Sequence, residues 1–284
     1  MFKKLINLIL VLALTSNAAL AGGGWPQKKG KGYFKLSQFV IISDSYYSPA
    51  GDILDIATAS VFNTSFYGEY GITDRLTAVA YIPFFARATL NEQVSGRDGR
   101  QLSPGDEVNS FGDTDLSLKY GLIVDKPIVV SATLTFGLPL GNEAGGDTQI
   151  LQTGDGEFNQ MVTIEASRGL RNGRAWISTL LAFNNRSNSF SDELRLGLEV
   201  GHKLGERWIV NAKLLSVNSL NNGSDLETPT NGIFSNNIEY LAFTPEVAYQ
   251  FDDKFGISAA IGTALNGRRV LASPSYSLGV FMNL

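Results

Sequence analysis

One stretch of the chain, residues 193–204, separates its side chains completely when it is read at period 2. One face carries Glu, Arg, Gly, Glu, Gly and Lys, and the other carries Leu, Leu, Leu, Val, His and Leu. Successive side chains of a β-strand point to opposite faces, whereas a helical period of 3.6 would scatter the leucines around the axis. The stretch therefore predicts a strand with one polar and one apolar face. By itself it leaves open whether the apolar face meets a protein core or a lipid bilayer.

The first 21 residues predict an export signal peptide. Lys3 and Lys4 precede an apolar run from Leu5 to Leu14, and residues 19–21, Ala-Leu-Ala, have the small side chains of a cleavage site. The apolar run is shorter than the roughly 20 residues that a membrane-spanning helix needs. Because the chain has no cysteine, neither a lipid anchor at the cleavage site nor a disulfide bond is expected.

Charge and composition exclude some classes of function. The signal peptide holds two of the 23 Lys and Arg residues, so 21 remain against 27 Asp and Glu. This acidic balance argues against nucleic acid as a partner. No later run is long and apolar enough for a transmembrane helix, so a membrane location would require a β-barrel, in which every backbone polar group is paired.

From residue 33 onward, strand signals recur with turn residues between them and predict twelve strands. These cover residues 33–43, 58–72, 75–90, 113–123, 127–140, 157–170, 174–186, 192–204, 207–219, 238–251, 254–266 and 273–284. The connections after even-numbered strands are tight turns containing Asp, Asn or Gly, and most of the others are long. This alternation is typical of outer-membrane barrels with periplasmic turns, and an even strand count would place both termini in the periplasm.

Three further features favour lipid over a soluble core. The predicted strands are longer than the ~5–6 residues typical of globular sheets. Aromatic residues gather near strand ends, as they do in membrane interfaces. The chain also stops inside an alternating strand. Alternation is ambiguous in residues 75–90 and 174–186. We therefore predict an all-β fold, a transmembrane antiparallel up-and-down β-barrel of about 12 strands over residues 33–284, following a flexible basic segment at 22–32. A soluble β-sandwich is the alternative.

The last strand resembles the C-terminal assembly signal of outer-membrane barrels. Ser277, Gly279, Met282 and Leu284 fit its pattern of a polar residue, a glycine two positions later and two large apolar residues, although Leu replaces the usual terminal Phe. The resemblance implies the barrel-assembly machinery as a partner. Outer-membrane lipid and lipopolysaccharide are the other expected neighbours. The acidic loops, which include Asp155 and Glu157, are interpreted as solvated faces that divalent cations bridge to lipopolysaccharide.

Three segments resemble the MetA-pathway-of-phenol-degradation family of outer-membrane transporters. They are residues 70–76 (YGITDRL), 111–120 (FGDTDLSLKY) and 153–158 (TGDGEF). The resemblance implies a barrel and the passage of a small, aromatic or apolar compound. It carries over no substrate-binding residue.

Catalytic and metal-binding patterns are weak. His202, the only histidine, falls on the apolar face of its strand. A barrel hydrolase of the His-x-Ser type needs serine two residues later, where this chain has Leu204. We therefore predict no catalytic residue. With one histidine and no cysteine, we also predict no metal site and no cofactor.

The most informative polar residues are charges on the predicted inward faces, at similar distances from the turns. They are Lys35, Glu69, Lys119, Glu165, Glu199, Lys213 and Glu246. A charge buried without a partner is very costly, so these groups face water or one another. One interpretation is a charged constriction that selects solutes. The other is a salt-bridge network that fills the lumen, and twelve strands lie between the filled barrels of ~8 strands and the open barrels of ~16.

The basic segment before the first strand suggests a plug. Lys28, Lys29 and Lys31 could enter an acidic lumen from the turn side, with Trp25 as a wedge. A plain linker is the alternative. Together these patterns predict a passive channel for small solutes in the outer membrane. The second hypothesis is a non-transporting barrel whose outer loops bind a ligand, an envelope component or a partner.

Overall fold

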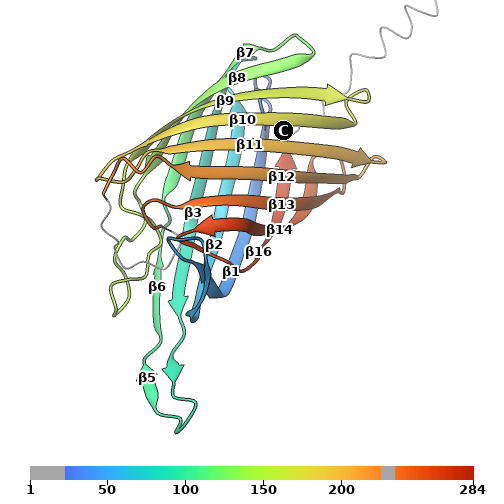
Figure 1. Cartoon of the computed structure of the whole chain (residues 1–284). Helices are drawn as coiled ribbons and strands as arrows, with labels where there is room; N and C mark the ends of the chain where they lie inside the picture. The colour runs from blue at the N-terminus through green and yellow to red at the C-terminus, as the bar shows by residue number, and fades with distance from the viewer. Residues whose placement is uncertain (1–22, 225–233) are drawn as a thin grey trace, which may run out of the picture.

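The computed structural model describes residues 23–224 and 234–284 and forms a closed antiparallel barrel (Figure 1). The predicted signal peptide, residues 1–21, lies outside the described residues. The twelve barrel strands are β1 (Gly32–Tyr47), β2 (Ile53–Gly71), β3 (Leu76–Leu90), β7 (Thr114–Ile123), β8 (Ile128–Leu138), β9 (Asn159–Leu170), β10 (Ala175–Arg186), β11 (Glu193–Leu204), β12 (Trp208–Ser219), β13 (Glu239–Gln250), β14 (Phe255–Arg268) and β16 (Ser275–Asn283). Each pairs with the next, and β1 pairs with β16 to close the ring. The predicted fold class and strand number are confirmed.

One end of the barrel, here named the turn end, carries the short connections. Asp252 Oδ1 accepts hydrogen bonds from the backbone N–H groups of Lys254 and Phe255, and Thr73 Oγ1 accepts one from Leu76 N. Side-chain caps of this kind replace ladder hydrogen bonds where the chain reverses. The last residue of the chain extends the β1–β16 pairing at this end, since Leu284 N donates a 2.8 Å hydrogen bond to Gly32 O. Within the described residues, no helix is long and apolar enough to cross a membrane.

The opposite end, the loop end, is more regular than the sequence predicts. Residues 44–57 were expected to form a loop, but β1 and β2 remain paired as far as Tyr47 and Ile53. The expected loop at 91–112 contains β4 (Gln93–Val94), β5 (Gln101–Ser103) and β6 (Asp106–Ser110), and β15 (Val270–Leu271) pairs with β1. In Figure 1 the β3–β6 pair continues beyond the barrel and ends near the β4–β5 hairpin. These extensions pair backbone groups in segments that the sequence predicts to be loops.

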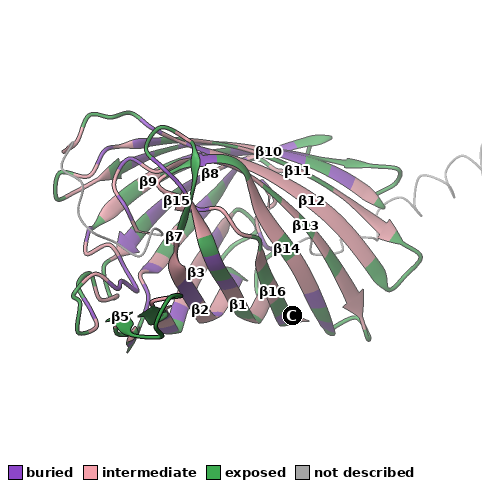
Figure 2. Cartoon of the chain, turned by 60° about the horizontal axis from the view of Figure 1, so that its bottom comes forward, coloured by how far each residue is buried: buried purple, intermediate pink, exposed green. Residues whose placement is uncertain are grey.

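The two faces of the barrel wall reverse the pattern of a soluble domain. Leu196 and Leu198 of β11 and Leu278 of β16 are exposed on the outside, Leu278 to 66%. The inside buries mainly serine, threonine and charged residues, among them Glu69 at 0% exposure. Figure 2 shows exposed positions along the strands of the wall, between intermediate and buried ones. An apolar exterior around a polar interior is the arrangement that suits a barrel surrounded by lipid. The closed ring also rules out the sandwich alternative.

Candidate functional site

Seven charged side chains form a belt inside the barrel, in the half nearer the turn end. The charge belt consists of Lys35 (β1), Glu69 (β2), Lys119 (β7), Glu165 (β9), Glu199 (β11), Lys213 (β12) and Glu246 (β13). Alternation along each strand and the register between strands place all seven on the lumen side. These are the seven residues that the sequence selects.

Lys119 occupies the most buried part of the charge belt. Its Nζ lies 3.7 Å from Glu69 Oε1 and 3.4 Å from Glu165 Oε2, and it donates a 2.9 Å hydrogen bond to the carbonyl oxygen of Gly23. The Glu69 carboxylate also accepts hydrogen bonds from Tyr67 Oη and, over 2.9 Å, from Gln27 Nε2. A buried ion needs compensating charge and hydrogen bonds, and this cluster supplies both.

The rest of the charge belt is paired as well. Lys35 Nζ lies 2.7 Å from Glu246 Oε1, and Lys213 Nζ lies 3.4 Å from Glu199 Oε2. Trp176 Nε1 donates a 2.7 Å hydrogen bond to Glu199 Oε1. This is the geometry of an internal salt-bridge network. The same side chains also point into the lumen and narrow it. The interpretation of these residues as a constriction that selects solutes stays a prediction.

The segment before β1 lies inside the turn end. Gly24 N donates to Ser167 Oγ over 2.7 Å, and Gln27 N donates to Thr77 Oγ1 over 2.8 Å. Lys29 forms a parallel bridge with Gly71 at the end of β2. These contacts join β2 and β3 on one side to β9 on the other. Residues 23–31 therefore cross the lumen at the level of the charge belt.

The contacts of this segment differ from the sequence expectation. The sequence predicts a flexible linker at 22–32, whereas residues 23–31 are tied to the barrel wall. Gly23, Gly24 and Gln27 make the inner contacts, while Lys28, Lys29 and Lys31 are exposed and Trp25 is half-buried. The physical reason is that the acids of the charge belt already have lysine partners. The lumen therefore binds uncharged amide and carbonyl groups and leaves the lysines in water.

A second ionic cluster lies at the loop end, and sequence reasoning missed it. The guanidinium of Arg186, at the end of β10, contacts Asp155 at 2.8 Å, Glu157 at 2.5 Å and Glu193 at 2.9 Å. Arg195 also contacts Glu193, at 2.5 Å. The sequence interpretation of Asp155 and Glu157 as solvated loop acids is wrong, because Glu157 is 1% exposed. The available signal was Arg186 itself, a cation at an inward position of β10.

Asp113 anchors the β8–β9 connection near this cluster. Its two carboxylate oxygens accept backbone hydrogen bonds from Gly141 (2.9 Å) and Asp155 (2.7 Å). Burial raises the pKa of Asp113 from 3.8 to about 7. The nearby Asp155 carboxylate also raises this pKa, whereas the two backbone hydrogen bonds lower it. Asp113 lies just before β7, outside the membrane-spanning strands.

The packing of residues 139–158 is expected to weaken as pH rises. Between pH 3.8 and about 7, Asp113 is protonated when the connection is packed and ionised when it is not. Proton binding therefore stabilises the packed connection at low pH, and this stabilisation is lost as the pH rises through that range. Hydrogen exchange of the Gly141 and Asp155 amides, corrected for intrinsic rates, should show greater protection at the acid end. Asp113→Asn should weaken the dependence and leave only the part due to Glu157, whose pKa burial also raises. Protection that stays constant or increases with pH would contradict this assignment.

The remaining predicted features lie away from both clusters. His202 pairs with Ala175 and Val210 in the wall of the barrel, on the outward side of β11. Within residues 23–224 and 234–284, no group of three or more His, Cys, Asp or Glu residues could hold a metal ion.

Solved structures with a similar fold are outer-membrane barrels. The COG4313 outer membrane channel from Pseudomonas putida F1 matches with a TM-score of 0.61 at 13% identity, over 93% of this chain and 100% of that chain. The translocator domain of autotransporter NalP from Neisseria meningitidis matches with a TM-score of 0.53 at 12% identity, over 99% and 96%. The NanC porin matches with a TM-score of 0.50 at 10% identity, over 88% and 100%.

These likenesses concern the fold, because the sequence identities are low. No protein-family model matches the sequence, and no curated protein does. The resemblance to the MetA-pathway-of-phenol-degradation family therefore stays a prediction. The class of protein is nevertheless defined: the chain is a twelve-stranded β-barrel of the outer-membrane type with a charged lumen.

Proposed function

We propose that the protein is an outer-membrane channel through which small solutes diffuse down their gradients, without covalent chemistry or a cofactor. The observation that carries the proposal is the charge belt: seven acidic and basic side chains, joined in ion pairs, inside a closed wall whose outer surface is apolar. Placing such groups in a lumen is useful where solutes and water pass. In this proposal the turn end and both termini face the periplasm, as short turns do in outer-membrane barrels.

We propose further that residues 23–31 act as a plug at the turn end. Support comes from their hydrogen bonds to separate parts of the wall, Gln27 to Thr77 on β3 and Gly24 to Ser167 on β9. A backbone that crosses the lumen at the charge belt reduces the cross-section where the side chains of the belt already narrow it. The plug therefore regulates the width of the channel at its periplasmic mouth.

The proposed solutes are small aromatic or apolar compounds. Between the charge belt and the loop end, several lumen-facing side chains are apolar or aromatic and half-buried, namely Phe39, Met161, Leu180, Leu215 and Tyr240. Such a surface lowers the cost of removing an apolar solute from water, whereas a sugar gains little from it. The resemblance to a family of transporters for phenol degradation implies the same class.

Uptake into proteoliposomes tests the channel and its solute class together. An aromatic acid should enter faster than a neutral sugar of similar size. Replacing two apolar lumen residues, Leu180→Gln with Leu215→Gln, should lower aromatic uptake several-fold, because their apolar contact is lost, while ion flux through the same variant serves as the control. Equal uptake of the aromatic acid and the sugar would reject the solute class, and the absence of any flux would reject the channel.

One observation favours a second candidate function, a barrel whose loops bind a ligand. A cleft of about 710 Å³ lies at the loop end and is lined by Arg87, Thr89, Asn91, Asp106, Asp147 and neighbouring residues. Its polar, charged lining suits a hydrophilic ligand such as part of an envelope component. Bilayers that stay closed, together with ligand binding that is lost when this cleft is mutated, would favour this candidate over the channel.

The last strand supports a proposed partner. Leu278, Val280 and Leu284 of the C-terminal region are exposed toward lipid, and Gly279 is buried. This arrangement is compatible with recognition of Ser277, Gly279, Met282 and Leu284 by the barrel-assembly machinery. Outer-membrane lipid and lipopolysaccharide would then surround the assembled barrel.

A further inference from the structure

The connection between β8 and β9 folds into the loop end of the barrel rather than away from it. We name residues 139–158 the strap. Leu151 is 1% exposed, and the next residues, Gln152 and Thr153, are buried as well. An external loop of this length would expose such side chains to water.

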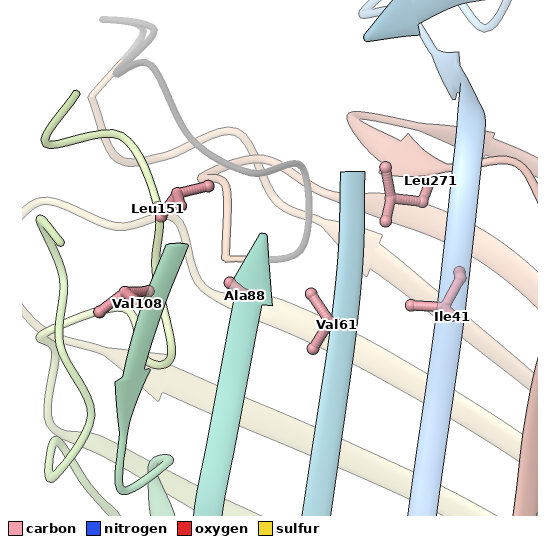
Figure 3. Packing of buried hydrophobic residues seen from close by; sticks show 6 residues of the cluster. All are labelled: Ile41, Val61, Ala88, Val108, Leu151 and Leu271. Atoms are coloured by element: carbon pink, nitrogen blue, oxygen red, sulfur yellow. The ribbon is translucent and has the colours of Figure 1, made fainter. Parts of the chain in front are cut away.

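One side of the strap packs against the inner wall of the first strands. Leu151 belongs to an apolar cluster with Ile41 (β1), Val61 (β2), Ala88 (β3), Val108 (β6) and Leu271 (β15) (Figure 3). Among the described residues, it is the strap's only member of that cluster. The apolar contacts that hold the strap against the first strands therefore come mainly from the side chain of Leu151.

The other side of the strap is tied to β10 and β11. Arg186 binds Asp155 and Glu157 of the strap and Glu193 of the wall, each through a different guanidinium nitrogen. Ser187 N adds a 2.9 Å hydrogen bond to Glu157 Oε2. In the ring, β10 is the sixth strand from β1 in either direction. The cluster around Leu151 extends over the first strands of the barrel, so the two anchors lie on different parts of the wall and the strap crosses the mouth between them.

We propose that the strap is the outer gate of the channel and that Arg186 is its latch. The inference rests on the proposed channel function. The latch assignment follows from charge: without the guanidinium, the carboxylates of Asp155, Glu157 and Glu193 would face one another with no cation between them except Arg195 beside Glu193. Repulsion between buried like charges would push the strap away from the wall, leaving Leu151 and the backbone hydrogen bonds to hold it.

The chain offers a reversible lock for the gate. A Cβ atom added at Gly145 in the strap would lie 3.0 Å from Val108 Cβ on β6. Disulfides have Cβ atoms roughly 3.5–4.5 Å apart, so Gly145→Cys with Val108→Cys needs only a small shift. Because the natural chain has no cysteine, no other disulfide can form. Oxidation should hold the strap in the mouth and suppress conductance in planar bilayers, and reduction should restore it. The single variant Gly145→Cys should not respond.

Release of the latch tests the same gate in the other direction. In a Thr153→Cys background, Arg186→Gln should speed modification by a membrane-impermeant maleimide at least several-fold and should raise conductance. Arg268→Gln is the matched control, since it breaks another loop-end ion pair, with Glu239 at 3.3 Å, that the strap does not share. It should change neither readout.

The possible outcomes separate the gate from the channel. Equal conductance of the oxidised and reduced double-cysteine protein would overturn the gate. Faster maleimide modification in Arg186→Gln without a rise in conductance would overturn it too. If no variant and no natural protein conducts, the channel function fails and the gate with it, although faster modification would still identify Arg186 as the latch of the strap.

Discussion

A protein that lacks residues 22–31 is expected to conduct more ions through each channel than the intact chain. The deleted residues cross the lumen at the charge belt, where Gln27 contacts Glu69 and Gly23 contacts Lys119. Since pore diameter sets ion flux, single-channel conductance in planar bilayers should rise, by roughly two-fold or more. Unchanged conductance would reject the plug.

A point substitution should reproduce this effect without removing any residue. A Cβ atom at Gly71 would lie 2.1 Å from the Lys28 carbonyl oxygen and 2.6 Å from that of Gln27, so Gly71→Ala should expel the segment from its place on β2. Faster hydrogen exchange at the Gln27 amide should accompany the higher conductance. Gly169→Ala is the matched control, because a Cβ atom on that glycine near the same end meets no atom within 4 Å. An equal rise in both variants would point to a general loosening of the barrel and not to the plug.

Most of the barrel was predictable because each face of a strand has one environment. In β11 every inward position is charged or glycine, so residues 193–204 read as a strand from their alternation alone. The tight turns were equally clear, since Asp252 and Asn172 are residues that stabilise chain reversals. Lipid on one side and a polar lumen on the other impose a period of 2 that few other structures share.

The two ambiguous strands break that period for different reasons. In β3 the register against β2 shifts between Thr64 and Phe66, so Val79 faces the lumen near the turn end but Ala86 and Ala88 face it near the loop end. A bulge of this kind moves each later side chain to the other face. In β10 the period is intact, but one of the side chains that face the lumen is Leu180. A polar lumen predicts a polar residue at that position.

The charge belt could be selected from the sequence, but its pairing could not. Distance from the turns places Lys119 and Glu165 at a similar height, yet their ion pair crosses β8, which lies between their strands. Such contacts depend on strand tilt and stagger, which alternation does not encode. Arg186 was missed for a related reason, because its partners in the strap follow no regular period and meet it only when the strap folds inward.

The second large effect is expected from Lys119→Met. The substitution would leave Glu69, at 0% exposure, and Glu165 buried without the cation that lies between them. Breaking a buried ion pair from one side typically costs about 3–5 kcal/mol, because the remaining charge has no partner. Urea unfolding of the barrel in lipid vesicles, followed by tryptophan fluorescence, should show a loss of this size.

Neutralising both partners should recover most of that loss. The triple variant Lys119→Met, Glu69→Gln, Glu165→Gln has no unpaired charge at this site, so its free energy of unfolding should return toward that of the natural protein. Lys213→Met is the control, since the side chain of Lys213 is 45% exposed and its pair with Glu199 should contribute about 1 kcal/mol or less. Two results would contradict this explanation: a Lys119→Met variant as stable as Lys213→Met, or a triple variant less stable than Lys119→Met. Either result would mean that unpaired buried charge is not the cause of the lost stability.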